Sequence, residues 1–96
     1  MWICSEMLEK EIEKYLREQV KLRGGVAFKF ISPGNVGVPD RLVLFPNGKI
    51  IFIELKATGK KTSKIQDIQI KKIRDLGFDV YVIDSKEEVL DAICTT

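Results

Sequence analysis

The sequence predicts a mixed α/β fold in which helices flank a mixed β-sheet, with the element order α-β-β-β-α-β-α. Three observations predict this fold. Amphipathic helical patterns open and close the chain, a Pro-Asn-Gly turn at 46–48 separates two apolar runs of strand length, and another helix separates the third strand from the fourth. The position of that helix predicts a right-handed parallel crossover between the last two strands, whereas the first three strands are predicted to form an antiparallel meander.

The first half of the chain contains one helix and one strand. A helix is predicted over Glu6–Arg23, with Ser5 as its N-cap and Gly24-Gly25 as its end. Its inward face recurs at steps of three and four residues: Leu8, Ile12, Tyr15, Leu16, Gln19 and Leu22. Val26–Ile31 is rich in aromatic and β-branched residues and is predicted as a strand. Residues 32–39 contain two prolines and two glycines, which predicts a loop.

The second half begins with a hairpin. Asp40–Phe45 and Lys49–Lys56 are its two predicted strands. A helix over Ser63–Leu76 ends at Gly77, and a strand over Phe78–Ile83 follows it. Residues 85–88 have the form of a capping box and open a last helix that ends near residue 93. Because no repeat or linker interrupts these elements, residues 1–96 are predicted to be one domain.

Composition excludes several functional classes. The chain has no histidine, which excludes Ser-His and Cys-His catalysis, and any metal ion must be held by oxygen atoms. Cys4 and Cys94 lie near opposite ends and are interpreted as reduced thiols. No signal peptide and no apolar run of membrane-spanning length is present, so we expect a cytoplasmic protein without a membrane partner. The modest core of so short a chain makes a homodimer plausible.

Positive charge is concentrated in one stretch. Residues 56–74 contain seven basic residues and one acid, although the whole chain has a net charge of only +2. Such clustering is typical of a surface that contacts nucleic-acid phosphates, and it is equally typical of a solvated lysine-rich helix face.

Three charged residues form the candidate site. Glu54 and Lys56 are two residues apart at the end of an apolar strand, so they project to the same face of the sheet. If residues 46–48 form a three-residue loop, with proline in a type I turn and glycine in the left-handed region, Asp40 faces Glu54. If only residues 47–48 form the turn, the two acids point to opposite faces. We favour the first register, in which a divalent cation such as Mg²⁺ or Mn²⁺ relieves the repulsion between the carboxylates.

The first predicted helix offers a third acid. Glu9 lies at the edge of the apolar stripe and can reach the sheet, and Glu13, one turn further along, remains the alternative. A purely structural interpretation is that Glu9 pairs with lysines on the surface of its own helix.

An extended set of motifs resembles a known family. Pro39-Asp40 and Glu54-Leu55-Lys56 are similar to the PD-(D/E)xK nuclease signature, and the wider pattern resembles the small stand-alone VRR-NUC (virus-type replication-repair nuclease) domains. The matching residues follow the family order over nearly the whole chain: Gly24-Gly25, Lys29-Phe30, Ser32-Pro33-Gly34, Gly37-Val38-Pro39-Asp40-Arg41-Leu42, Phe52-Ile53-Glu54-Leu55-Lys56, Gly59-Lys60, Gln66 and Gly77-Phe78.

The resemblance implies a fold, an activity and a site. The fold would be a restriction-endonuclease-like core, and the activity metal-dependent hydrolysis of DNA by a homodimer similar to Holliday-junction resolvases. The resemblance also implies that the protein acts in a bacterial or phage-infected cell. Asp40, Glu54 and the Leu55 backbone carbonyl would bind Mg²⁺ or Mn²⁺, and Lys56 would act on the attacking water and the scissile phosphate. Glu9 would correspond to the first-helix acid of the family, and Gln66 to its helix-start glutamine.

Other residues have two interpretations each. Gln66 is also the fourth residue of a Ser63 capping box, in which its side chain has no chemical role. Lys29 either points toward phosphate or is a solvated edge-strand lysine, and Arg41 is placed on the face opposite Asp40, in a structural role. The candidate DNA-binding residues are Lys29, Ser32, Lys60, Lys61, Lys64 and Lys71.

Three functions therefore compete. The favoured one is a dimeric endonuclease that cleaves branched DNA such as a four-way junction. The second is a nucleic-acid-binding module without catalysis, which would use the basic stretch 56–74. The third is a structural domain in which Glu54 and Lys56 are simply an ion pair.

Overall fold

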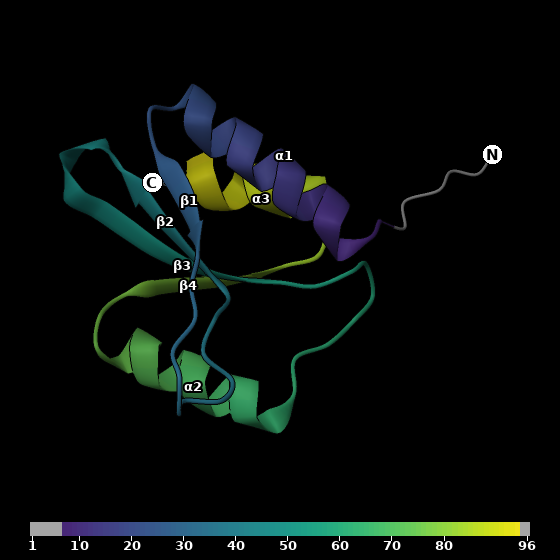
Figure 1. Cartoon of the computed structure of the whole chain (residues 1–96), viewed down its shortest axis with the longest axis vertical. Coiled ribbons are helices and arrows are strands. Elements are labelled where there is room, and N and C mark those ends of the chain that lie inside the picture. The colour runs from purple at the N-terminus through teal and green to yellow at the C-terminus, as the bar shows by residue number, and fades with distance from the viewer. Residues whose placement is uncertain (1–6, 95–96) are drawn as a thin grey trace.

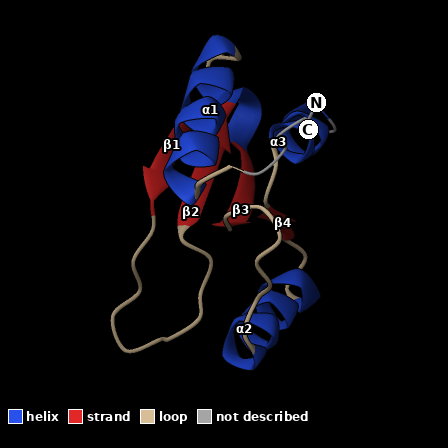
Figure 2. Ribbon diagram, turned by 90° about the vertical axis from the view of Figure 1, so that its right-hand side faces the viewer, coloured by secondary structure: helices blue, strands red, loops and turns tan. Residues whose placement is uncertain are grey.

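The computed structural model describes residues 7–94. Helices cover both faces of a four-stranded sheet with strand order β1-β2-β3-β4 (Figures 1 and 2). The elements are α1 (Glu9–Leu22), β1 (Val26–Lys29), β2 (Arg41–Phe45), the 3-10 turn η1 (Pro46–Gly48), β3 (Lys49–Leu55), α2 (Lys64–Asp75), β4 (Asp79–Ile83) and α3 (Lys86–Cys94). The α-β-β-β-α-β-α order is confirmed.

The strand directions are also as predicted. β1 pairs with β2 and β2 with β3 in antiparallel fashion, whereas β3 and β4 are parallel. In the β2–β3 hairpin Phe45 pairs with Lys49 and Arg41 with Ile53, which is the register of the three-residue loop. The turn itself differs from the prediction, because Asn47 (φ 72°) and Gly48 (φ 79°) both occupy the left-handed region. A side chain as short as that of asparagine tolerates this conformation.

The start of α1 corrects the sequence-based boundary. Residues 7 and 8 precede the helix, which begins at Glu9 rather than at Glu6. Met7 is held outside the helix because its N–H donates to the Thr58 side chain (3.0 Å) and its carbonyl accepts from the Thr58 N–H (3.1 Å). The Glu11 carboxylate caps the new start by accepting from the Leu8 N–H at 2.8 Å. Ser5, the expected N-cap, lies outside the described residues.

The main core lies between the sheet and the α1/α3 layer. Ile12, Leu16 and Val20 of α1 and Val89, Ala92 and Ile93 of α3 pack on alternate residues of the strands, which are Val43, Ile51, Ile53, Leu55 and Ile83. All are almost completely buried, and each fully buried side chain of this size contributes about 1.5–3 kcal/mol. This layer leaves the other face of the sheet for α2 and the site.

The opposite face carries α2 and the long β1–β2 loop. Ile70 of α2 packs toward β4, where Val80 is buried. The loop lies against the start of α2: a Cβ on Gly37 (φ +93°) would come within 2.8 Å of the Ile65 carbonyl oxygen, so only glycine fits there. This close approach leads the chain into Pro39 and Asp40.

Among residues 7–94, no helix has both the length and the apolar character needed to cross a bilayer.

Candidate active site

Asp40 and Glu54 lie side by side at the open end of the hairpin. Arg41 pairs with Ile53, so the same register places Asp40 opposite Glu54 on the α2 face. Asp40 is held there because its Oδ1 accepts from the Leu55 N–H at 3.2 Å and its carbonyl accepts from the Phe30 N–H at 2.8 Å. The predicted juxtaposition of the two acids is therefore present in the structure.

Glu54 is the charged residue most deeply removed from solvent in the described chain, at 5% exposure. Burial, and after it the neighbouring Asp40 charge, raise the pKa of its carboxyl group to about 7, while Lys56 opposes both effects. A buried carboxylate beside a second acid is unfavourable in the absence of a compensating cation. This is the electrostatic environment that a divalent metal ion relieves.

Lys56 provides one compensating charge. Its Nζ lies 3.5 Å from Glu54 Oε2, as expected for two residues on one face of a strand. Its backbone N–H donates to the Ile83 carbonyl at 2.9 Å, which fixes the strand just beyond β3. The ammonium is thus held at the site by the β3–β4 pairing.

Gln66 caps α2, as the capping-box interpretation predicts, and it also contacts Glu54. Its Oε1 accepts from the Ser63 N–H at 2.9 Å, and its backbone N–H donates to Ser63 Oγ at 3.3 Å, which completes the capping box of α2. Its Nε2 donates to Glu54 Oε2 at 3.2 Å. The cap therefore orients the amide so that its free N–H reaches the buried acid.

Arg41 is a site residue that sequence reasoning missed. Its backbone lies on the opposite strand face from Asp40, as predicted, but its Nη1 turns back to the Asp40 carbonyl (2.9 Å) and Asp40 Oδ2 (3.3 Å). Its buried Nε has no hydrogen-bond partner and lies 3.8 Å from Glu13 Oε2. Strand alternation places Cβ atoms only, and a side chain as long as arginine can reach around the end of a strand.

The two candidate acids of α1, Glu9 and Glu13, have different surroundings. Glu13 accepts a hydrogen bond from Arg17 Nε at 2.8 Å and lies beside Arg41, so it faces a pair of cations. Glu9 is exposed in the first turn of α1, yet its charge contributes to the raised pKa of Glu54. Glu9 is thus the helix acid whose field reaches the carboxylate pair.

The donor set is suitable for a hard cation. Among residues 7–94, no three Cys, Asp or Glu side chains converge on one point. Asp40 and Glu54 supply two carboxylates, the Leu55 carbonyl is the expected third donor, and water or phosphate oxygens would complete the shell. Such oxygen-only donors fit Mg²⁺ or Mn²⁺.

The predicted DNA-binding residues come from β1, the β1–β2 loop, the loop before α2 and α2 itself. Five lysines are exposed, and Lys71 pairs with Asp75 at 2.7 Å; the set is Lys29, Lys60, Lys61, Lys64 and Lys71. Ser32 Oγ accepts from Asn35 Nδ2 at 2.9 Å within the β1–β2 loop. The loop before α2 is anchored by Asp84, whose carboxylate accepts from the Gly59 N–H at 3.0 Å.

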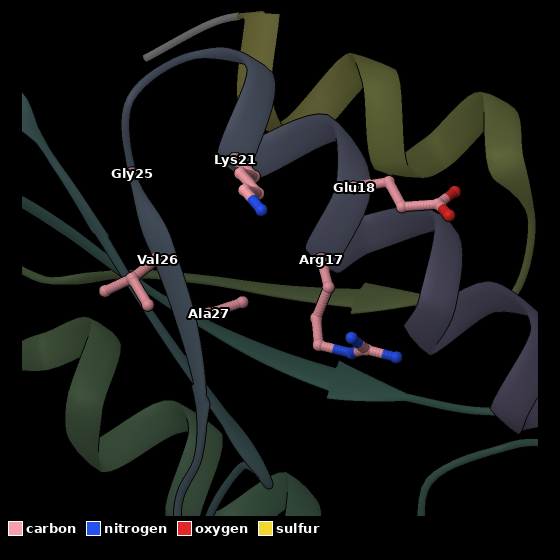
Figure 3. A pocket seen from close by; sticks show the side chains of 6 residues that line it. All are labelled: Arg17, Glu18, Lys21, Gly25, Val26 and Ala27. Atoms are coloured by element: carbon pink, nitrogen blue, oxygen red, sulfur yellow. The ribbon is translucent and has the colours of Figure 1, made fainter.

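A pocket of about 420 Å³ lies elsewhere, between α1 and the β1 edge of the sheet (Figure 3). It is lined by Arg17, Glu18, Lys21, Gly25, Val26 and Ala27. None of the candidate site residues lines it.

Comparisons with known proteins agree with the fold and the motif. Residues 4–87 match the family model of the VRR-NUC domain, and the chain therefore belongs to this family. It is 51% identical over 79 residues to "Putative nuclease p44" of Acyrthosiphon pisum secondary endosymbiont phage 1, an alignment that covers 82% of this chain and 85% of the phage protein. A solved structure described as a VRR_NUC domain superposes with a TM-score of 0.82 at 32% identity, over 88% of this chain and 92% of the other.

Proposed function

We propose that residues 1–96 form a single nuclease domain, a divalent-metal-dependent DNA endonuclease that acts as a homodimer on branched DNA such as a four-way junction. The observation that carries the proposal is the environment of Glu54, an acid that is 5% exposed and lies beside Asp40, Lys56 and Gln66. Membership of the VRR-NUC family and the similarity to a phage protein named as a nuclease support the same activity.

The proposed roles come from the family resemblance, and the geometry of the site supports them. Asp40, Glu54 and the Leu55 carbonyl would hold Mg²⁺ or Mn²⁺, with Glu9 as a further candidate ligand. The metal would supply charge neutralisation at phosphate and a bound water of lowered pKa. Lys56 lies against Glu54 and would stabilise the additional negative charge of the pentavalent phosphate. Gln66 would keep Glu54 Oε2 in place by donating to it.

The surrounding surface supports a nucleic-acid substrate. The exposed lysines near the site would contact phosphates, and the binding would weaken as salt increases. Paired cuts across a junction require two active sites related by a twofold axis, and one chain offers one carboxylate pair. These considerations support the homodimer.

The test is cleavage of a labelled four-way junction, a flap and a matched linear duplex with Mg²⁺, Mn²⁺ or EDTA. Asp40→Asn and Lys56→Met should each lose cleavage by at least about 100-fold, since each removes a charge that stabilises the transition state. Lys49→Met is the matched control, because Lys49 pairs with Asp79 on the surface, 3.0 Å away and outside the site. Salt-sensitive binding without cleavage under any metal would instead identify a binding module.

A further inference from the structure

The sheet face that carries α2 is apolar well beyond the area that α2 covers. Two cross-strand rows lie on this face, because paired residues project to the same side. One row contains Phe28, Leu42, Phe52 and Val80, and the next contains Val26, Leu44 and Ile50. We count Phe78 with the second row, because it directly precedes β4 and its ring centroid lies 6.0 Å from that of Phe52. Figure 2 shows α2 beneath β4, at the opposite edge of the sheet from β1. The β1, β2 and β3 portions of both rows are therefore left without a helix among the described residues.

This area, which we call the open sheet patch, exposes large side chains. Val26 is 42% exposed, Phe28 52%, Ile50 37% and Phe78 45%, with Leu42, Leu44 and Phe52 half-buried between them. Phe52 stacks edge-on against Phe78 and Phe30, each at 6.0 Å between ring centroids, so the patch has a packed aromatic floor. Figure 3 shows Val26 pointing away from α1 while its neighbour Ala27 points toward it.

The chemistry of the patch favours protein over nucleic acid. All eight residues of the two rows are apolar and three are phenylalanines. Interface centres are depleted of charge and enriched in aromatic residues, whereas contacts to a phosphate backbone need lysine or arginine. The lysines lie outside these rows.

The size of the patch fits a symmetric interface. Its exposed apolar area is on the order of 500 Å², which is about the apolar share of the roughly 800 Å² that each partner buries in a stable complex. Patches of this size on a free monomer are themselves commonly functional. A patch without charges can face a copy of itself without like-charge repulsion.

The position of the patch relates it to the candidate site. The next row on the same face, toward the other end of the strands, contains Asp40 and Glu54. Rows on one face are about 7 Å apart, so the carboxylate pair borders the patch. Two copies joined here would each present an active site at the edge of the shared interface.

We propose that the open sheet patch is where a second copy of this chain docks, an inference that rests on the homodimeric nuclease proposed above. The two copies would bury Phe28 and Ile50 against the equivalent residues around a twofold axis.

The test is the oligomeric state of the Lys56→Met protein, measured by sedimentation equilibrium without DNA or metal. Phe28→Lys with Ile50→Lys should raise the dimer dissociation constant by at least about 30-fold, because each charge would lie at the centre of the interface. Leu22→Lys, at a side chain 77% exposed on α1, is the matched control and should leave the dimer intact. Circular dichroism verifies folding, and Val26→Lys with Phe78→Lys tests the same patch if the first pair does not fold.

The outcomes separate the two proposals. The proposed docking surface is wrong if the Lys56→Met protein without patch substitutions is a monomer. It is also wrong if the dimer survives the patch substitutions. A dimer that is lost in these variants and kept in Leu22→Lys would support it, even if the unsubstituted chain cleaves no DNA. If the protein is monomeric in this measurement, and a separate hydrogen-exchange measurement shows that added single-stranded DNA protects the patch, the patch would be assigned to nucleic acid and the dimer rejected.

Discussion

Asp40 is held by groups that have no direct role in the proposed chemistry. The Leu55 N–H binds one carboxylate oxygen, while the Arg41 guanidinium contacts the other oxygen and the Asp40 carbonyl. Arg41 thus sets the direction of the acid, and it links that acid to Glu13 of α1. Its place in the structure is that of a positioning residue.

Replacing Arg41 should weaken metal binding. Arg41→Met should lower Mn²⁺ affinity by about 10- to 100-fold, since groups that orient metal ligands commonly have effects of this size. Arg41→Lys should recover part of the loss, and direct Mn²⁺ titration by calorimetry measures it. Arg17→Met is the control, because Arg17 contacts the same Glu13 carboxylate and not Asp40. Equal losses in both variants would show that Glu13, rather than Asp40, carries the effect.

Glu54 should make the metal-free protein less stable as pH rises. Its pKa is about 7 in the folded chain against an ordinary 4.5, so the folded state holds the proton more tightly than the unfolded state. The free energy of unfolding therefore falls between about pH 4.5 and pH 7 and is level above that window. Glu54→Gln removes this titration, and above pH 7 it should be more stable than the unsubstituted chain by on the order of 2 kcal/mol.

Urea unfolding in the presence of a chelator, at pH 5 and at pH 8, measures this difference. A stability gap between the two proteins that does not widen with pH would contradict the assignment. In an Asp40→Asn background, Glu54→Gln should stabilise the chain less above pH 7, because the neighbouring charge that helps to raise the Glu54 pKa has been removed.

At the scale of elements, α2 is joined to the site through its first turn. Ser63 and Gln66 cap the helix, and of these two residues only Gln66 also donates a hydrogen bond to Glu54. Ser63→Ala should lower the free energy of unfolding by about 1 kcal/mol and leave turnover nearly unchanged. Gln66→Ala should cost a similar amount and also lower kcat. Thermal melts measure the effect on stability, and single-turnover cleavage measures the effect on the reaction. Equal kcat values for Ser63→Ala and Gln66→Ala would show that Gln66 only caps the helix.

Local patterns account for much of the fold and the acid pair, and two of their failures, at the start of α1 and at Arg41, come from long-range contacts. The Pro46–Gly48 turn determines the hairpin register, so the juxtaposition of Asp40 and Glu54 could be predicted from short-range turn chemistry. The start of α1 was predicted wrongly because Thr58, 51 residues away from Met7, holds the preceding segment. The contacts of Arg41 were missed because its side-chain direction depends on Asp40 and α1 together.

At the scale of the whole molecule, the lysines around α2 should determine salt sensitivity. Lys60→Ala and Lys64→Ala should each reduce the slope of log affinity against log salt by about 1 if each lysine contacts one phosphate. Lys10→Ala, exposed on α1, should not change the slope. Fluorescence anisotropy over a salt series on Asp40→Asn protein measures this, and unchanged slopes would place the DNA elsewhere.

The sequence pattern of α2 does not predict how much of the sheet face this helix covers. Its sequence fixes which face is apolar, but how far one helix extends over a four-strand sheet depends on the β3–β4 crossover and the β1–β2 loop together. The open sheet patch is a result of that three-dimensional arrangement.

The Asp40–Glu54 pair also bears on the order in which the chain folds. Both acids belong to one hairpin, and Lys56 and Gln66 follow within the next 12 residues of the sequence, so the site is built from contacts of short sequence separation. Short loops close early and at small entropic cost. The two carboxylates repel each other at the open end of this hairpin, the end farthest from the turn. A cation in solution therefore stabilises this end of the forming sheet more than any other part of it.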